Sequence, residues 1–171
     1  MRYRDAPTVE VSEKLGDVEP RSVWEIVTDI ALPTHTDGEL VGVEWVGPAQ
    51  QIAVGARFLG TNSSELRGTW TVECEIVEVE PERRFVWTAG SATTGPWATW
   101  AFEIDPTPRG VVVRQWARLG PGSSPLAEII ATRPDREAQI IARRMGDWRA
   151  SMQANLDLVK QRLAVDTPHV G

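Results

Sequence analysis

Apolar and polar residues alternate through much of residues 8–119, and this period of two predicts β-strands. Glycine, proline, asparagine and serine are concentrated in the short connections between these segments, which favours antiparallel pairing of consecutive strands. The predicted strands are Thr8–Leu15, Leu40–Val46, Ala56–Asn62, Thr69–Val79, Arg84–Thr88, Trp97–Asp105 and Val111–Leu119.

The same alternation assigns faces to the strands, because successive side chains of a strand point to opposite sides. The last strand is ambiguous, since Arg114 and Arg118 indicate an outward face but Trp116 lies between them. Its inward residues would then be Val113, Gln115 and Ala117. In the three preceding strands the inward residues are Trp70, Val72, Cys74 and Ile76, then Phe85 and Trp87, then Trp100, Phe102 and Ile104.

Helical periodicity flanks the strand region. A short helix is predicted at Pro20–Asp29, where proline is tolerated in the first turn, and residues 33–38 form a loop or one further turn. A brief helix at Leu126–Ala131 and a long one from about Pro134 to Leu163 follow the last strand. One stripe of the long helix is apolar at spacings of three and four: Ala138, Ile141, Met145, Trp148, Met152, Leu156, Val159 and Leu163.

These elements predict an α+β domain in which a curved seven-stranded antiparallel sheet wraps around the C-terminal helix. The sheet must cover its apolar face, and only this helix is long enough to do so. A strongly twisted sheet does not touch the helix everywhere, so we expect a cavity between them. One domain is expected over residues 1–171, with a core at about 8–163 and a frayed tail at 164–171.

Charge and cysteine content argue against several classes of function. The net charge is −6 and there is no basic stripe, so we expect no nucleic-acid partner. The adjacent Arg143 and Arg144 are interpreted as solvated surface of the long helix. Cys74 is the only cysteine, which excludes an internal disulfide and a cysteine-built zinc cluster.

The motifs in the sequence argue against further classes of function. No metal-ligand spacing, phosphate-binding glycine loop or nucleophile elbow is present, so no metal and no cofactor are expected. Charges throughout the first thirty residues argue against a signal peptide, and no apolar run is long enough for a membrane span. We expect a soluble cytoplasmic protein without membrane insertion, as a monomer or homodimer.

A family resemblance runs through residues 8–163. It is carried by Gly55–Asn62, Trp70, Cys74, Val77, Pro81, Phe85 and Trp87. In these residues the chain resembles the SRPBCC (START-like) superfamily, and within it the polyketide cyclase/dehydrase and lipid-transport group. The resemblance implies a helix-grip fold with two short helices after the first strand and a deep hydrophobic cavity. It implies no single function, because cyclases, lipid carriers, hormone receptors and co-chaperone-like modules share this fold.

The inward aromatic and thioether side chains are the predicted ligand-binding set. Eight tryptophans against three phenylalanines and one tyrosine favour a flat apolar surface that adapts to a ligand, although the same residues could simply fill a core. The candidate ligand-binding residues are Trp70, Val72, Cys74, Phe85, Trp87, Trp100, Phe102, Gln115, Met145, Trp148 and Met152.

Three residues are candidate catalytic groups. His35 could act as a general base near neutral pH, or be an exposed loop histidine. Asp29 could hold His35 or act as an acid, although its place at a helix end favours a local backbone role. Arg57 could stabilise an enolate or bind a ligand carboxylate, or point to solvent. Asn62 could, like Gln115, orient a polar group of the ligand.

The sequence therefore predicts a protein that binds a small hydrophobic molecule, either a polyketide-like aromatic or a lipid. Whether it also catalyses a cyclisation or dehydration stays open. Two alternatives also stay open: a non-catalytic carrier or chaperone for a lipid or isoprenoid, and a protein-interaction module with a vestigial pocket.

Overall fold

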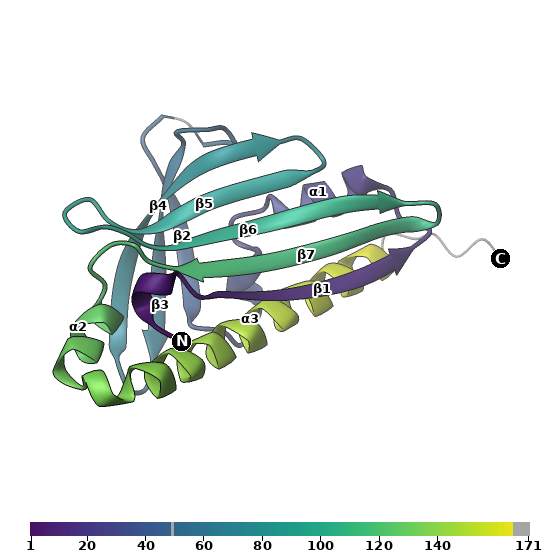
Figure 1. Cartoon of the computed structure of the whole chain (residues 1–171). Helices are drawn as coiled ribbons and strands as arrows, with labels where there is room; N and C mark the ends of the chain where they lie inside the picture. Colours follow the sequence, from purple (N-terminus) through teal and green to yellow (C-terminus); the bar gives the residue numbers. More distant parts are fainter. Residues whose placement is uncertain (49, 166–171) are drawn as a thin grey trace.

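The computed structural model describes residues 1–48 and 50–165, which form one antiparallel sheet, three α-helices and three short 3₁₀ helices (Figure 1). The strands are β1 Thr8–Gly16, β2 Leu40–Val46, β3 Arg57–Ser64, β4 Gly68–Glu80, β5 Arg84–Ser91, β6 Gly95–Thr107 and β7 Gly110–Leu119. The helices are α1 Pro20–Val27, α2 Pro125–Thr132 and α3 Glu137–Val165, with η1 Tyr3–Asp5, η2 Leu32–His35 and η3 Pro134–Arg136.

The sheet has seven strands in the order β1-β7-β6-β5-β4-β3-β2. Strands β2 to β7 pair with their neighbours in sequence, and β1 closes the row by pairing with β7. The long helix α3 runs along the sheet from α2 at one end to the C-terminal end of the chain, and packs against β1, β7 and α1 (Figure 1). This arrangement confirms the predicted helix-grip fold.

The curvature of the sheet has local causes. The pairing register shifts between Leu40 and Gly42, between Ile76 and Glu78, and between Ala89 and Gly90. Such bulges bend a strand and increase its twist. A Cβ atom at Gly90 would lie 2.4 Å from a backbone oxygen of β6, so only glycine permits this close approach. The bent strands leave space between the sheet and the straight helix.

Helix boundaries differ slightly from the predicted ones. Helix α1 ends at Val27 instead of Asp29, because Thr28 caps it by donating from its hydroxyl to the carbonyl of Trp24 at 2.6 Å. Helix α3 begins at Glu137, after η3, and continues to Val165. Residues 164 and 165 of the predicted tail are therefore helical, and residues 166–171 lie outside the described part of the chain.

The structure shows which side chains of β7 point inward, a point that the sequence left open. Its inward residues are Val113, Gln115 and Ala117, all buried on the concave side of the sheet. Trp116 alternates with them and lies on the convex side, where its indole N–H donates to Glu103 at 2.9 Å. A tryptophan between arginines is thus compatible with an outward face when a neighbouring strand supplies a partner.

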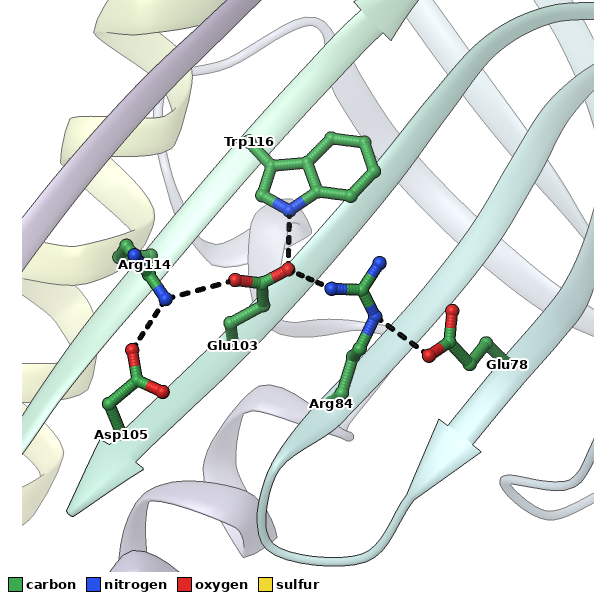
Figure 2. Close-up of polar contacts among 6 residues, drawn as sticks. All are labelled: Glu78, Arg84, Glu103, Asp105, Arg114 and Trp116. Atoms are coloured by element: carbon green, nitrogen blue, oxygen red, sulfur yellow. Dashed lines mark hydrogen bonds and ion pairs between the residues drawn. The ribbon is translucent and has the colours of Figure 1, made fainter.

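Glu103 is the centre of an ion network on the convex side (Figure 2). Arg84, Glu103 and Arg114 face one another in register across β5, β6 and β7. Arg84 pairs with Glu103 and with Glu78 at 2.8 Å, and Arg114 pairs with Glu103 at 3.2 Å and with Asp105 at 2.5 Å. The network links four consecutive strands, β4 to β7, on the face away from α3.

Candidate functional site

Two adjoining hollows lie between the concave face of the sheet and α3. The first, about 140 Å³, is bounded by Pro33 and Thr36, in and just after η2, and is named the η2 chamber. The second, about 400 Å³, is bounded by Leu126 and Ile129 of α2 and is named the α2 chamber. Six residues line both chambers: Asn62, Val72, Ala89, Trp100, Arg144 and Trp148. The shared walls make the chambers two parts of one cavity.

Aromatic rings form much of the cavity wall. Phe85 and Trp87 are stacked with ring centroids 4.7 Å apart, and Trp87 is nearly parallel to Trp100 at 6.4 Å. Trp100 of β6 then contacts Trp148 of α3 at 4.7 Å. These contacts follow from the inward alternation of β5 and β6. The Trp100–Trp148 pair joins sheet to helix where the two chambers meet.

Most of the predicted ligand-binding residues line this cavity. Trp100 and Val72 border both chambers together with Trp148, and Trp70 borders the α2 chamber. The others that line the η2 chamber are Cys74, Phe85, Trp87, Phe102 and Gln115. Met145 and Met152 line neither chamber and are buried in the core. A helical stripe identifies buried positions but does not tell a packed core from a cavity wall.

Arg144 is a cavity residue that the sequence analysis wrongly assigned to the solvated surface. Its Nη1 donates to Oε1 of Glu39 at 2.9 Å and forms an ion pair with Oε2 at 2.8 Å, and its guanidinium lies 5.4 Å from the Trp148 ring centroid. Only 13% of its side chain is exposed, whereas Arg143 is fully on the surface. The available signal was position, since Arg144 lies one turn before Trp148.

Burial acts on the protonation of Arg144. It lowers the pKa of the guanidinium from its usual value, the charge and hydrogen bond of Glu39 oppose this, and the positive charge of Arg67 adds to it. An arginine stays protonated at neutral pH despite such a shift. The cavity therefore contains a permanent cation with one carboxylate partner.

A second polar pair lines the η2 chamber. Asn155 of α3 donates from Nδ2 to Oε1 of Gln115 at 3.1 Å, and both side chains are buried. The Oδ1 atom of Asn155 is buried and has no hydrogen-bond partner among the described residues. Asn155 was not predicted, although it lies seven residues after Trp148 and so on the same helix face. An unpaired buried acceptor beside a cavity is available to a donor from a ligand or water.

The candidate catalytic residues are not brought together. Asp29 lines the η2 chamber, but its carboxylate accepts from the backbone N–H of Ala31 at 2.9 Å and pairs with Arg162. His35 is exposed on η2 and lines neither chamber. Arg57 is also exposed and pairs with Glu73 at 3.2 Å. Within the described chain no hydrogen bond or ion pair joins any two of Asp29, His35 and Arg57.

Cys74 is buried in the wall of the η2 chamber between sheet residues. Burial raises the pKa of its thiol to about 12. The thiolate needed for nucleophilic attack is therefore almost absent at neutral pH, which agrees with the reading of Cys74 as a small hydrophobic side chain.

Residues 1–48 and 50–165 contain neither a metal-binding cluster nor a membrane-spanning helix. No group of three or more His, Cys, Asp or Glu side chains there is placed to bind a metal ion. No helix there is both long and apolar enough to cross a membrane.

A curved sheet that holds a long C-terminal helix across a hollow defines the helix-grip class of proteins. A sequence model of the family described as "Polyketide cyclase / dehydrase and lipid transport" matches residues 7–164. The chain belongs to this family, within the SRPBCC group that its residues resemble. No curated protein matches the sequence.

Solved structures share the fold at low sequence identity. Protein MLL2253 from Mesorhizobium loti is 21% identical, with a TM-score of 0.60 over 94% of this chain and 99% of that one. The Polyketide_cyc-like protein Cgl2372 from Corynebacterium glutamicum is 20% identical, with a TM-score of 0.63 and 96% of each chain covered. The di-domain ARO/CYC BexL from the BE-7585A biosynthetic pathway is 14% identical, with a TM-score of 0.64 over 90% of this chain and 49% of BexL.

Proposed function

We propose that the protein binds a small hydrophobic ligand, an aromatic polyketide-like molecule or a lipid, in the η2 and α2 chambers. The observation that carries the proposal is the cavity itself, whose indole-rich walls enclose space that side chains do not fill. Moving apolar surface from water into such a space is favourable by about 25 cal/mol per Å². Membership of the family described as "Polyketide cyclase / dehydrase and lipid transport" supports the same class of ligand.

The expected binding mode places an apolar or aromatic body against Trp100 and Trp148. Rigid indoles offer large contact areas and lose little conformational freedom on binding. The walls also carry polar groups, among them Arg144 and Asn62, which line both chambers, and Asn155 in the η2 chamber. The free Oδ1 of Asn155 could accept a hydrogen bond from a ligand hydroxyl. Such a site orients a ligand through a small number of directional contacts.

Ligand holding is better supported than acid–base catalysis. Of the three candidate catalytic residues only Asp29 lines the cavity, and its carboxylate already has partners. A general base must reach the proton it removes, directly or through one water molecule. His35 would need η2 to move before it could do so. We therefore place carriage or holding of the ligand first, and catalysed cyclisation or dehydration second.

The proposal is tested by identifying what the protein retains. Organic extraction of purified protein, followed by mass spectrometry, should yield a bound apolar molecule in stoichiometric amount. Replacing Trp148 by Leu should weaken rebinding of that molecule about fivefold or more, as expected for a buried aromatic anchor. The control is Trp116→Phe, which alters a tryptophan on the convex face and should leave binding unchanged. Absence of any retained or rebinding apolar molecule would refute the proposal.

A further inference from the structure

We infer that the ligand carries an anionic group, and that Arg144 and Arg67 bind this group in the α2 chamber while the apolar body lies against the tryptophans. The inference rests on the proposed ligand-binding function and specifies its chemistry. The ligand class is an amphipathic carboxylic acid.

The charge of the α2 chamber is the first argument. Arg67 and Arg144 both line it, and none of the described residues that line it is acidic. This local excess of positive charge occurs in a protein of net charge −6. Arg144 has a carboxylate partner in Glu39, whereas Arg67, which is exposed, has none in the described chain, so one positive charge at the chamber is not neutralised by a nearby carboxylate. A carboxylate in the chamber would supply the missing charge.

The hydrogen-bonding capacity of the two arginines is the second argument. Glu39 lines the η2 chamber, and both of its oxygens engage the same nitrogen, Nη1 of Arg144. Among the described residues, neither Nε nor Nη2 of Arg144 has a hydrogen-bond partner. Arg67 lies over Trp70 at 5.8 Å and has no carboxylate within ion-pair distance in the described chain. Free guanidinium donors bind a carboxylate with two parallel hydrogen bonds.

The rest of the chamber fits the apolar part of such a ligand. Trp97, Trp100, Trp148, Leu126 and Ile129 form its walls around the two cations. A fully polar anion would leave these surfaces in contact with water. A neutral hydrocarbon would leave Arg67 without a carboxylate partner, and Nε and Nη2 of Arg144 without hydrogen-bond partners among the described residues. A molecule with one charged end and one apolar end satisfies both. The arrangement therefore selects for amphipathic acids.

The experiment compares an acid with a neutral molecule of the same shape. Isothermal titration calorimetry of the full chain at low ionic strength would use 1-naphthaleneacetate against 1-naphthaleneethanol, and decanoate against 1-decanol. We expect each acid to bind about tenfold or more tightly than its alcohol, as charge-assisted hydrogen bonds require. Arg144→Gln and Arg67→Gln should each reduce this preference severalfold.

A matched control removes the same charge from a neighbouring site. Arg143→Gln changes the adjacent residue of α3, which is exposed, and should leave the preference for acids intact. Arg67 is exposed at the β3–β4 turn, so Arg67→Gln keeps the test valid if Arg144→Gln fails to fold. Equal affinity for acids and alcohols would overturn this inference and leave the proposed function standing. Binding of neither member of either pair would also overturn this inference, and the proposed function would then be decided by the extraction experiment alone.

Discussion

The two faces of the sheet use the same arginine–glutamate chemistry in different surroundings. On the convex face, Arg84 and Arg114 share Glu103, and each has a further carboxylate (Figure 2). On the concave side, Arg144 of α3 has Glu39 as its only carboxylate partner among the described residues and borders the cavity. Each convex-face arginine has two carboxylate partners and lies away from the cavity, which indicates a structural role, whereas Arg144 has one carboxylate partner and borders space that a ligand can enter.

The comparison predicts unequal costs for the same Glu→Gln change. Glu39→Gln should lower the free energy of unfolding by about 3 kcal/mol, because Arg144 loses the only carboxylate that pairs with it in the described chain while it is mostly buried. This value is at the low end for buried pairs, since 29% of the Glu39 side chain is exposed. Urea denaturation measures it. A loss under about 0.5 kcal/mol would show that Arg144 is adequately solvated without Glu39.

Cys74 can be used to test whether water is excluded from the concave face of the sheet. Its thiol has an unperturbed pKa of 9.0 in the unfolded chain and a raised pKa of about 12 in the folded one. Above pH 9 the unfolded chain therefore loses a proton that the folded chain keeps, and stability falls as pH rises, by about 1.4 kcal/mol per pH unit. Stability curves of wild type and Cys74→Ala between pH 8 and about 11 measure this difference.

The slope assigned to Cys74 is the difference between the two proteins, so other groups that titrate in this range cancel. Parallel curves would mean that water reaches the thiol in the folded protein. If water is excluded, the Cys74 thiol should react slowly with a disulfide reagent in the native protein and quickly after unfolding.

Glu103→Gln on the convex face should have a smaller effect than Glu39→Gln. Arg84 keeps Glu78 and Arg114 keeps Asp105, so neither cation is left alone. Both arginine side chains are also 34% exposed, against 13% for Arg144, so we expect a loss of about 1 kcal/mol although Glu103 itself is only 16% exposed. Ligand affinity should not change, because the network lies on the face away from the cavity. The contrast between the two faces fails if Glu103→Gln costs as much as Glu39→Gln in the same denaturation assay.

His35→Ala should have the smallest effect. The side chain is exposed on η2 and lines neither chamber, so we expect a change in unfolding free energy within about 0.5 kcal/mol and a ligand affinity within about twofold. Denaturation and calorimetry measure the two quantities. A large loss of affinity, or of any turnover found, would restore His35 as a functional residue.

The concave wall was predictable from sequence because alternation alone assigns strand faces. That rule identified Trp87, Trp100 and Phe102 without any tertiary information. It could not settle β7, where the outward Trp116 depends on Glu103 in another strand. The helical stripe identified Trp148 correctly as a cavity residue but not Met145, since burial is common to core and wall.

The polar part of the site was beyond sequence reasoning for a physical reason. The partner of Arg144 is Glu39, which lies 105 residues away in the chain, and only the folded sheet brings the two together. Asn155 of α3 likewise donates a hydrogen bond to Gln115 of β7, which is 40 residues away in the chain. The candidate catalytic groups were chosen by residue type. For Arg57 the sequence did hold a signal, because strand alternation places it on the face opposite Phe58, and the structure has Arg57 exposed and Phe58 buried.

A structure of the protein determined with 1-naphthaleneacetate bound tests the central claim most directly. The account predicts that the ring system lies in the α2 chamber against Trp100 and Trp148, with the carboxylate within hydrogen-bond distance of Arg144. A ligand bound elsewhere, or chambers closed by side chains in direct contact, would contradict it.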